Sequence, residues 1–179
     1  MSDVDEIGPV ELREAFHALS SDDRADRRPW AATPGTWWRE GRLAPEVAGV
    51  VGTVLTWCTM VDDDAGVSRV DLLSSLAALA HDGRLAESDL DRLLTGVEAQ
   101  WTPEPERPYT DALRAALGRA VKPQRSRKGY LWSLVDHVHA LTSPDAATRE
   151  AAVAPAKAEL GVAEADRHAL DAVIGWSTA

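Results

Sequence analysis

Six cationic side chains stand close together in a chain that is acidic as a whole. The stretch from Thr110 to Tyr130 contains one acidic residue, Asp111, and carries +5, whereas the whole chain carries −10. Arginine makes forked contacts with phosphate, lysine acts as a point charge, and an aromatic ring can stack on a base. The basic segment, residues 114–128, together with the tyrosine after it therefore predicts a site for a nucleic acid or a phosphorylated ligand, formed by Arg119, Lys122, Arg125, Arg127, Lys128 and Tyr130.

A second interpretation of the basic segment needs no nucleic acid. Pro123 and Gly129 indicate a loop in its middle, between two predicted helices. A cationic loop on an acidic protein can pair with acidic helices of its own chain, or it can face an acidic protein partner. A net charge of −10 also repels nucleic acid on average.

Two adjacent tryptophans suggest a surface for a protein partner. They lie between residues 27 and 45, a stretch with three prolines that is predicted to be an irregular loop. Neighbouring side chains of such a loop do not easily both point inward, and tryptophan and arginine are common anchors of protein interfaces. Trp37, Trp38 and Arg39 are therefore predicted to contact a partner. The alternative is that the loop folds back over the helices as a lid.

Aspartates recur in a weak internal repeat, in which residues 64–72 align with residues 82–90 at an offset of eighteen. Each copy has an acidic residue, a tight turn and a second aspartate just before a leucine. Aspartate at this place typically caps a helix and meets the positive end of its dipole. No metal or cofactor is predicted, and Asp62, Asp64 and Asp71 are the side chains best placed to bind a divalent cation if one is held.

Residues 82–89 (DGRLAESD) resemble the second half of an EF-hand calcium loop. Residues 76–85 (LAALAHDGRL) are similar to the helix and turn of TerB-like tellurite-resistance domains. Positions 1 and 3 of the calcium loop would be Ala78 and Ala80, whose side chains have no oxygen to offer a hard cation. Both similarities are short, and no family is assigned from them.

Sequence signatures of enzymes are absent from the chain. It contains no Gly-x-Ser-x-Gly, no P-loop, no dinucleotide fingerprint and no His-Glu-x-x-His. His137 and His139 would lie about 200° apart on a helix and cannot bind one ion together. The single cysteine, Cys58, lies in an apolar run. A small helical enzyme remains a lower-ranked alternative, because side chains distant in sequence can converge on one site.

The elements that must position these residues are predicted to be helices. Apolar side chains recur at helical spacing, and no segment alternates as a strand would. The prediction is an all-α protein of seven or eight helices, with the irregular tryptophan loop near the N-terminus. The periodic stretches are residues 9–19, 45–61, 68–80, 87–101, 113–121, 131–141, 145–160 and 170–174.

Length and composition favour one globular domain over residues 1–179, or a division at the proline-rich residues 102–108. Apolar residues make up 45% and charged residues 27% of the chain, as in ordinary globular proteins. The longest uncharged stretch, residues 47–61, is too short to cross a bilayer, so no membrane contact is predicted. The first residues are acidic and lack the features of a secretory signal, which favours a cytoplasmic location.

Together these patterns favour a non-catalytic, cytoplasmic interaction module that makes protein–protein contacts within a larger assembly. The alternative is a protein that binds a nucleic acid or a phosphorylated ligand through residues 114–128. The two hypotheses assign different surfaces, the tryptophan pair for the first and the basic segment for the second.

Overall fold

The computed structural model describes residues 4–98, 102–124 and 128–179, and within these ranges every regular element is a helix. The prediction of an all-α protein is confirmed for this part of the chain. In chain order the elements are α1 (Pro9–Leu19), α2 (Arg24–Arg27), α3 (Thr33–Arg39), α4 (Pro45–Val61), α5 (Ser68–His81), α6 (Glu87–Glu98), the 3₁₀ helix η1 (Glu104–Glu106), α7 (Arg107–Leu117), α8 (Lys128–Leu141), α9 (Ala146–Ala158) and α10 (Glu164–Thr178).

The described ranges contain ten α-helices rather than the seven or eight predicted. The two additional helices are α2, which ends at the start of residues 27–45 where the irregular loop was expected, and α3, which lies within that stretch. Asp23 caps α2, since its carboxylate accepts the backbone N–H of Ala25 at 2.9 Å. In α3 a proline occupies the first turn, where its missing N–H costs little. Trp37 and Trp38 therefore lie on a helix, and the prediction of an irregular tryptophan loop is corrected.

Helix α4 is the centre of the protein. It contacts α5, α6, α8 and α10, and its buried residues lie on all sides of the helix axis. A helix that is apolar all round belongs in a core, and α4 contains the longest uncharged stretch of the chain, residues 47–61. No helix in the described ranges is long and apolar enough to span a membrane.

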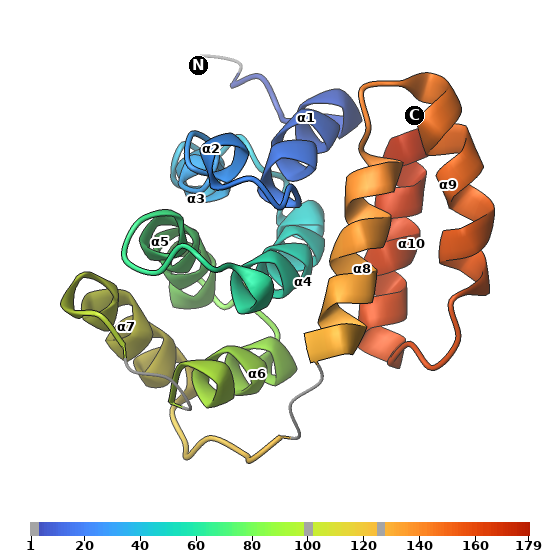
Figure 1. Ribbon diagram of the computed structural model, residues 1–179. Helices are drawn as coiled ribbons and strands as arrows, with labels where there is room; N and C mark the ends of the chain where they lie inside the picture. Colours follow the sequence, from blue (N-terminus) through green and yellow to red (C-terminus); the bar gives the residue numbers. More distant parts are fainter. Residues whose placement is uncertain (1–3, 99–101, 125–127) are drawn as a thin grey trace.

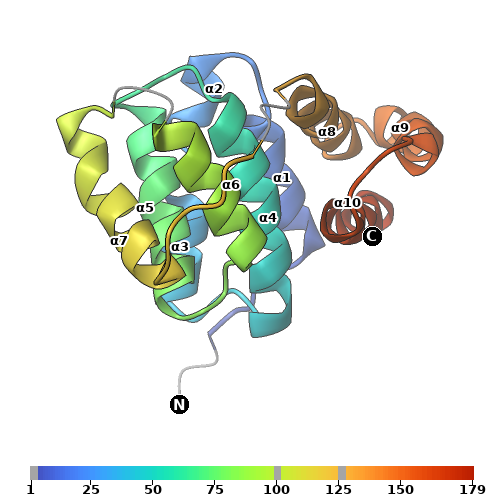
Figure 2. The same cartoon turned by 90° about the horizontal axis from the view of Figure 1, so that it is seen from below.

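The helices form two groups. In Figures 1 and 2, α8, α9 and α10 lie side by side next to the block made by α1–α7. Helices α1 and α4 of the block contact both α8 and α10. Buried side chains of the two groups belong to one cluster, which extends from Ile7 to Trp176. The name C-terminal group is used below for α8–α10.

Candidate interaction sites

A close contact between α3 and α5 fixes the position of the two tryptophans. The backbone N–H of Gly35 donates to Ser75 Oγ at 3.1 Å, and the same hydroxyl donates to the carbonyl of Ala31 at 3.0 Å. A Cβ atom added at Gly35 would stand 2.7 Å from the Cα of Ser75. Any larger residue at this position would therefore push α3 away from α5.

Trp37 and Trp38 point in different directions. Successive residues on a helix are rotated by about 100°, so only one of the two indoles can face the core. Trp37 is 7% exposed and belongs to the core cluster, while Trp38 is half-buried. The prediction that both indoles face outward is wrong for Trp37, because the segment is a helix.

Trp38 is held in one orientation at the surface. Its indole N–H donates to Asp82 Oδ2 at 2.7 Å, and the guanidinium carbon of Arg84 lies 5.6 Å from the centre of a Trp38 ring. Arg39, the next residue on α3, donates to Ser74 Oγ at 3.3 Å. The name Trp38 surface is used below for Trp38, Arg39, Asp82 and Arg84.

The first cation of the predicted anion site is engaged within the chain. Arg119 forms an ion pair with Glu87 and a two-pronged one with Asp91, both on α6. The hydrogen bond from Arg119 lowers the pKa of Asp91 to about 2. The backbone N–H of Lys122 also donates to Asp91, at 3.0 Å. This part of the basic segment thus pairs with an acidic helix, as the second interpretation of the sequence expects.

The remaining members of the predicted anion site differ in their exposure and in their partners. Arg125 and Arg127 lie outside the described residues. The side chains of Lys122 and Lys128 are exposed, before α8 and at its first residue. Tyr130 is half-buried, and its hydroxyl donates to Oδ2 of the buried Asp166 at 2.7 Å, so the hydroxyl already has a partner within the chain.

Trp132 was not among the predicted site residues, although it lies only two positions after Tyr130. Its side chain is 42% exposed, more than that of any other tryptophan the structure describes. The signal was present, because Leu131, Leu134 and Val138 define the buried stripe of α8 and Trp132 lies about 100° beyond Leu131. Trp132 is one turn from Lys128, so an aromatic ring and a cation occupy neighbouring surface positions.

The aspartates proposed as metal ligands are bound by arginines of α2 and of the turn after it. Arg27 Nε donates to Asp62 Oδ2 at 2.9 Å, and the two nitrogens of Arg28 donate to Asp64 at 2.9 and 3.0 Å. The hydrogen bond from Arg28 lowers the pKa of Asp64. Asp71, the third candidate, is half-buried on α5. In the part of the chain that the structure describes, no three His, Cys, Asp or Glu side chains are placed to hold a metal together.

Asp64 also has the capping role that the repeat predicted. Its carboxylate accepts the backbone N–H of Ser68, the first residue of α5, at 3.3 Å. The corresponding aspartates of the second copy make other contacts. Asp82 accepts the indole N–H of Trp38, and Asp89 is buried on α6 and accepts the hydroxyl of Thr53 at 2.7 Å.

A buried carboxylate joins four helices. Asp166 on α10 is 1% exposed, and its oxygens accept the indole N–H of Trp57 on α4 at 3.0 Å. They also accept two guanidinium hydrogen bonds from Arg92 on α6, at 3.2 and 2.9 Å, and the hydroxyl of Tyr130 on α8. Burial raises the pKa of nearby Asp89, whose carboxylate lies 3.8 Å from Arg92.

The hydrogen bonds of Asp166 hold α4, α6, α8 and α10 together, which is a structural role. Among the described residues, no buried side-chain nitrogen or oxygen lacks a hydrogen-bond partner. A general base must be able to reach a substrate proton, whereas Asp166 is 1% exposed and both its oxygens already accept hydrogen bonds from the protein. A pocket at the α1–α2 turn is open to solvent and is lined by residues 21–24.

Comparisons of the chain with protein-family models, with curated proteins and with solved structures find no match in any of the three. Two surfaces of the protein carry candidate binding residues, the Trp38 surface and the pair formed by Lys128 and Trp132.

Proposed function

We propose that the protein is a non-catalytic, cytoplasmic interaction module of a larger assembly, and that it contacts a protein partner through the Trp38 surface. The observation that supports the proposal is a partly exposed indole whose orientation is fixed before any partner binds. Asp82 and Arg84 hold the ring, and α3 is itself held against α5 at Gly35.

An ordered tryptophan is well suited to anchor an interface. Binding costs free energy for every side chain that must be immobilised, and the Trp38 ring is immobilised in the free protein. Tryptophan and arginine are enriched among the residues that dominate binding energy. The contact between Arg84 and Trp38 also strengthens when a partner removes water from it.

The charges of the Trp38 surface favour an acidic partner. Arg39 and Arg84 are two cations against one anion, Asp82, on a protein whose net charge is −10. Opposite charges steer association and set its rate. We therefore expect the partner to present carboxylates around an apolar pocket that takes the indole.

The first prediction concerns partner capture by variants of this surface. Trp38→Ala and Arg39→Ala are each expected to weaken binding of proteins recovered with the wild-type chain from its native host. For a dominant contact, which is worth at least about 2 kcal/mol, the loss is about 30-fold or more. Quantitative mass spectrometry of the captured proteins measures the effect.

Arg39→Ala is the cleaner of the two variants, because the hydrogen bond it removes is exposed and 3.3 Å long. Its melting temperature should equal that of the wild type. Lys157→Ala on the exposed side of α9 is the matched control for a lost surface cation. If Arg39→Ala and Trp38→Ala recover the same proteins in the same amounts as Lys157→Ala, the Trp38 surface is not the contact site.

A second candidate function is binding of a single-stranded nucleic acid or a phosphorylated ligand. The observation that favours it is the placement of Lys128 and Trp132, exposed side chains one turn apart at the start of α8. Single strands bind where cations follow the backbone and aromatic rings stack on bases. Lys122 is exposed on the other side of the basic segment, and Arg125 and Arg127 are members of this site from the sequence alone.

The second prediction concerns oligonucleotide binding at low ionic strength, where phosphate contacts are strongest. Trp132→Ala is expected to weaken binding of a mixed single-stranded oligonucleotide by about 1–3 kcal/mol, since one stacked base is lost. Lys128→Ala should weaken binding and also reduce its dependence on salt. Fluorescence polarisation of a labelled oligonucleotide measures both effects, and undetectable binding of the wild type at low salt rejects this function.

A further inference from the structure

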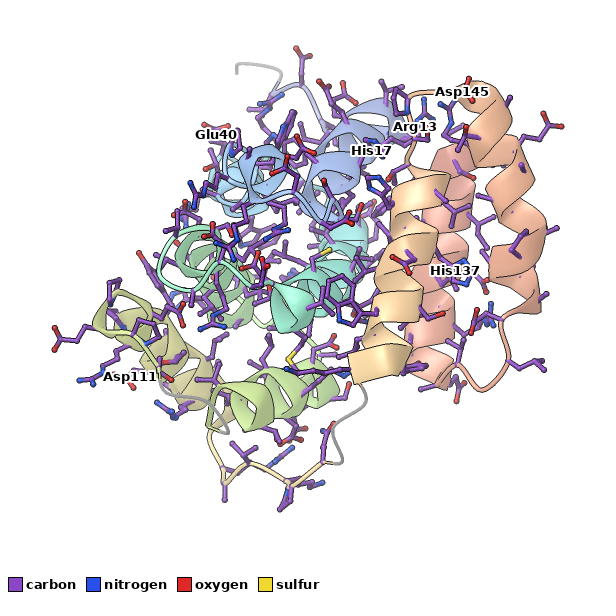
Figure 3. All side chains as sticks on the ribbon, viewed as in Figure 1. Arg13, His17, Glu40, Asp111, His137 and Asp145 are labelled. Carbon is purple, nitrogen blue, oxygen red and sulfur yellow. The ribbon has the colours of Figure 1, made fainter. Side chains whose placement is uncertain are left out.

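Two histidines far apart in the sequence stack on each other where α1 meets α8. The ring centres of His17 and His139 are 4.1 Å apart, and the ring planes differ by 15°. His17 Nδ1 lies 3.1 Å from the carbonyl oxygen of His139, and His139 Nδ1 lies 3.1 Å from the carbonyl oxygen of His17. Figure 3 shows His17 on the side of α1 that faces α8.

These contacts fix which nitrogen of each ring carries the hydrogen. A carbonyl oxygen can only accept a hydrogen bond, so Nδ1 must be the donor in both rings. The hydroxyl of Ser20 lies 3.2 Å from His139 Nδ1 and donates its own hydrogen to the carbonyl of Phe16. Each ring therefore carries a hydrogen on Nδ1, and in the neutral form of such a ring the nitrogen that can accept a proton is Nε2.

The surroundings of His17 between α1 and α8 favour its neutral form. Burial lowers the pKa of His17, and the neighbouring His139 lowers it further, while Asp26 on α2 acts in the opposite direction. The charged residues one turn before the two histidines on their own helices are Arg13 and Glu14 on α1 and Asp136 on α8, of which Glu14 and Asp136 are exposed. Protonating both rings would place two like charges at stacking distance.

The stacked pair belongs to the contact between α1 and the C-terminal group. Beside it, Phe16 packs against Trp176 of α10 with ring centres 5.6 Å apart. Arg13 donates to the carbonyl oxygens of Trp176 and Ala179, at 2.7 and 2.8 Å, and so is engaged at the end of α10. Helix α1 thus holds both α8 and α10.

We propose that the stacked histidines make this contact sensitive to pH. Protonation of the His17 ring weakens the packing of α1 against α8, so the C-terminal group is held more tightly at neutral pH than in mild acid. The proposed pH response is a change in how tightly α1 contacts α8. It does not depend on the partner proposed for the Trp38 surface.

The direction of the pH effect follows from proton binding. A histidine whose pKa is lower in the folded protein than its ordinary value of 6.5 binds more protons in the unfolded chain. The stabilisation from the neutral pair is therefore complete above pH 6.5 and is lost as the pH falls below that value. One proton changes the unfolding constant by at most about tenfold per pH unit.

The third prediction compares urea unfolding of the wild type with His17→Gln between pH 5.5 and 7.5. Glutamine has an N–H for the same carbonyl but does not titrate, so the loss of stability in acid should be smaller in the variant. His168→Gln, an exposed histidine of α10, is the matched control and should retain the wild-type slope. His137 and its partner Glu159 are present in all three proteins and cancel from the comparison.

Nuclear magnetic resonance of the wild type tests the same proposal without a substitution. The nitrogen shifts of both rings should report a hydrogen on Nδ1, and His17 should gain its proton on Nε2 below pH 6.5. A neutral ring with its hydrogen on Nε2 instead of Nδ1, or a midpoint for His17 at or above the ordinary value, overturns the proposal. So does a wild-type slope retained in His17→Gln.

Discussion

Asp166→Ala is expected to lower the free energy of unfolding by about 3–5 kcal/mol, the usual cost of removing one partner of a buried ion pair. Arg92 would keep its charge in the interior without the carboxylate that accepts two of its hydrogen bonds. The indole N–H of Trp57 and the hydroxyl of Tyr130 would lose the same acceptor. Urea denaturation at pH 7 measures the loss.

Two further variants test whether the loss of stability comes from the buried network and not from any substitution in α10. Glu164→Ala lies two residues earlier on an exposed part of the helix and should change stability by no more than about 0.5 kcal/mol. Adding Arg92→Leu to Asp166→Ala removes the orphaned charge, so the double variant should lose less than the sum of the two single ones. A loss below about 1 kcal/mol for Asp166→Ala would contradict the network.

The Asp166 network also explains how the C-terminal group is joined to the rest of the protein at a second place. Trp57 and Arg92 belong to the α1–α7 block, whereas Tyr130 and Asp166 belong to the C-terminal group. The network lies beside Tyr130 at the start of α8, and the stacked histidines lie further along the same helix. The C-terminal group is thus joined to the α1–α7 block at two places along α8.

Most of the helices could be predicted from apolar spacing because their burial follows a local pattern. In α6 the predicted stripe of Leu90, Leu93 and Leu94 is buried. The same holds for Leu131, Leu134 and Val138 of α8. These helices are long enough for a stripe to be visible, and the long apolar run of α4 identified the centre of the core.

The short helices could not be predicted because their stability comes from distant residues. A helix of four residues such as α2 is not stable alone. Its Arg27 is held by aspartates 35 and 36 positions later in the chain. In α3, the fit of Gly35 against Ser75 plays the same part, and it decides which tryptophan is buried. Nothing within residues 24–39 signals these partners.

The sites were predicted less well than the helices, for the same reason. The basic segment was visible as a run of charge, but its pairing with α6 depends on Asp91, 28 residues before Arg119. The Asp166 network and the stacked histidines unite residues separated by up to 109 and 122 positions. Trp132 is the exception, because the spacing of the apolar residues of α8 alone predicts that Trp132 lies outside the buried stripe of that helix.

Arg27→Ala is expected to cost about 3–5 kcal/mol of unfolding free energy, because Asp62 would remain buried without its cation. The side chains of Arg27 and Asp62 are 6% and 0% exposed. Arg27 also donates to Asp63 at 2.6 Å and to the carbonyl of Ser21 at 2.9 Å, so one guanidinium joins the start of α2 to the α4–α5 turn. Arg27→Lys should lose part of this stability, since an ammonium lacks the planar fork.

Arg24→Ala is the matched control, because it removes an arginine of the same helix whose ion pair with Asp63 is exposed on both sides. Exposed pairs contribute at most about 1 kcal/mol, and less in high salt. Thermal and urea unfolding should therefore separate the two arginines by at least about 2 kcal/mol. Equal losses would mean that α2 is held by its apolar contacts, and that the Asp62 carboxylate tolerates the loss of Arg27 by taking up water.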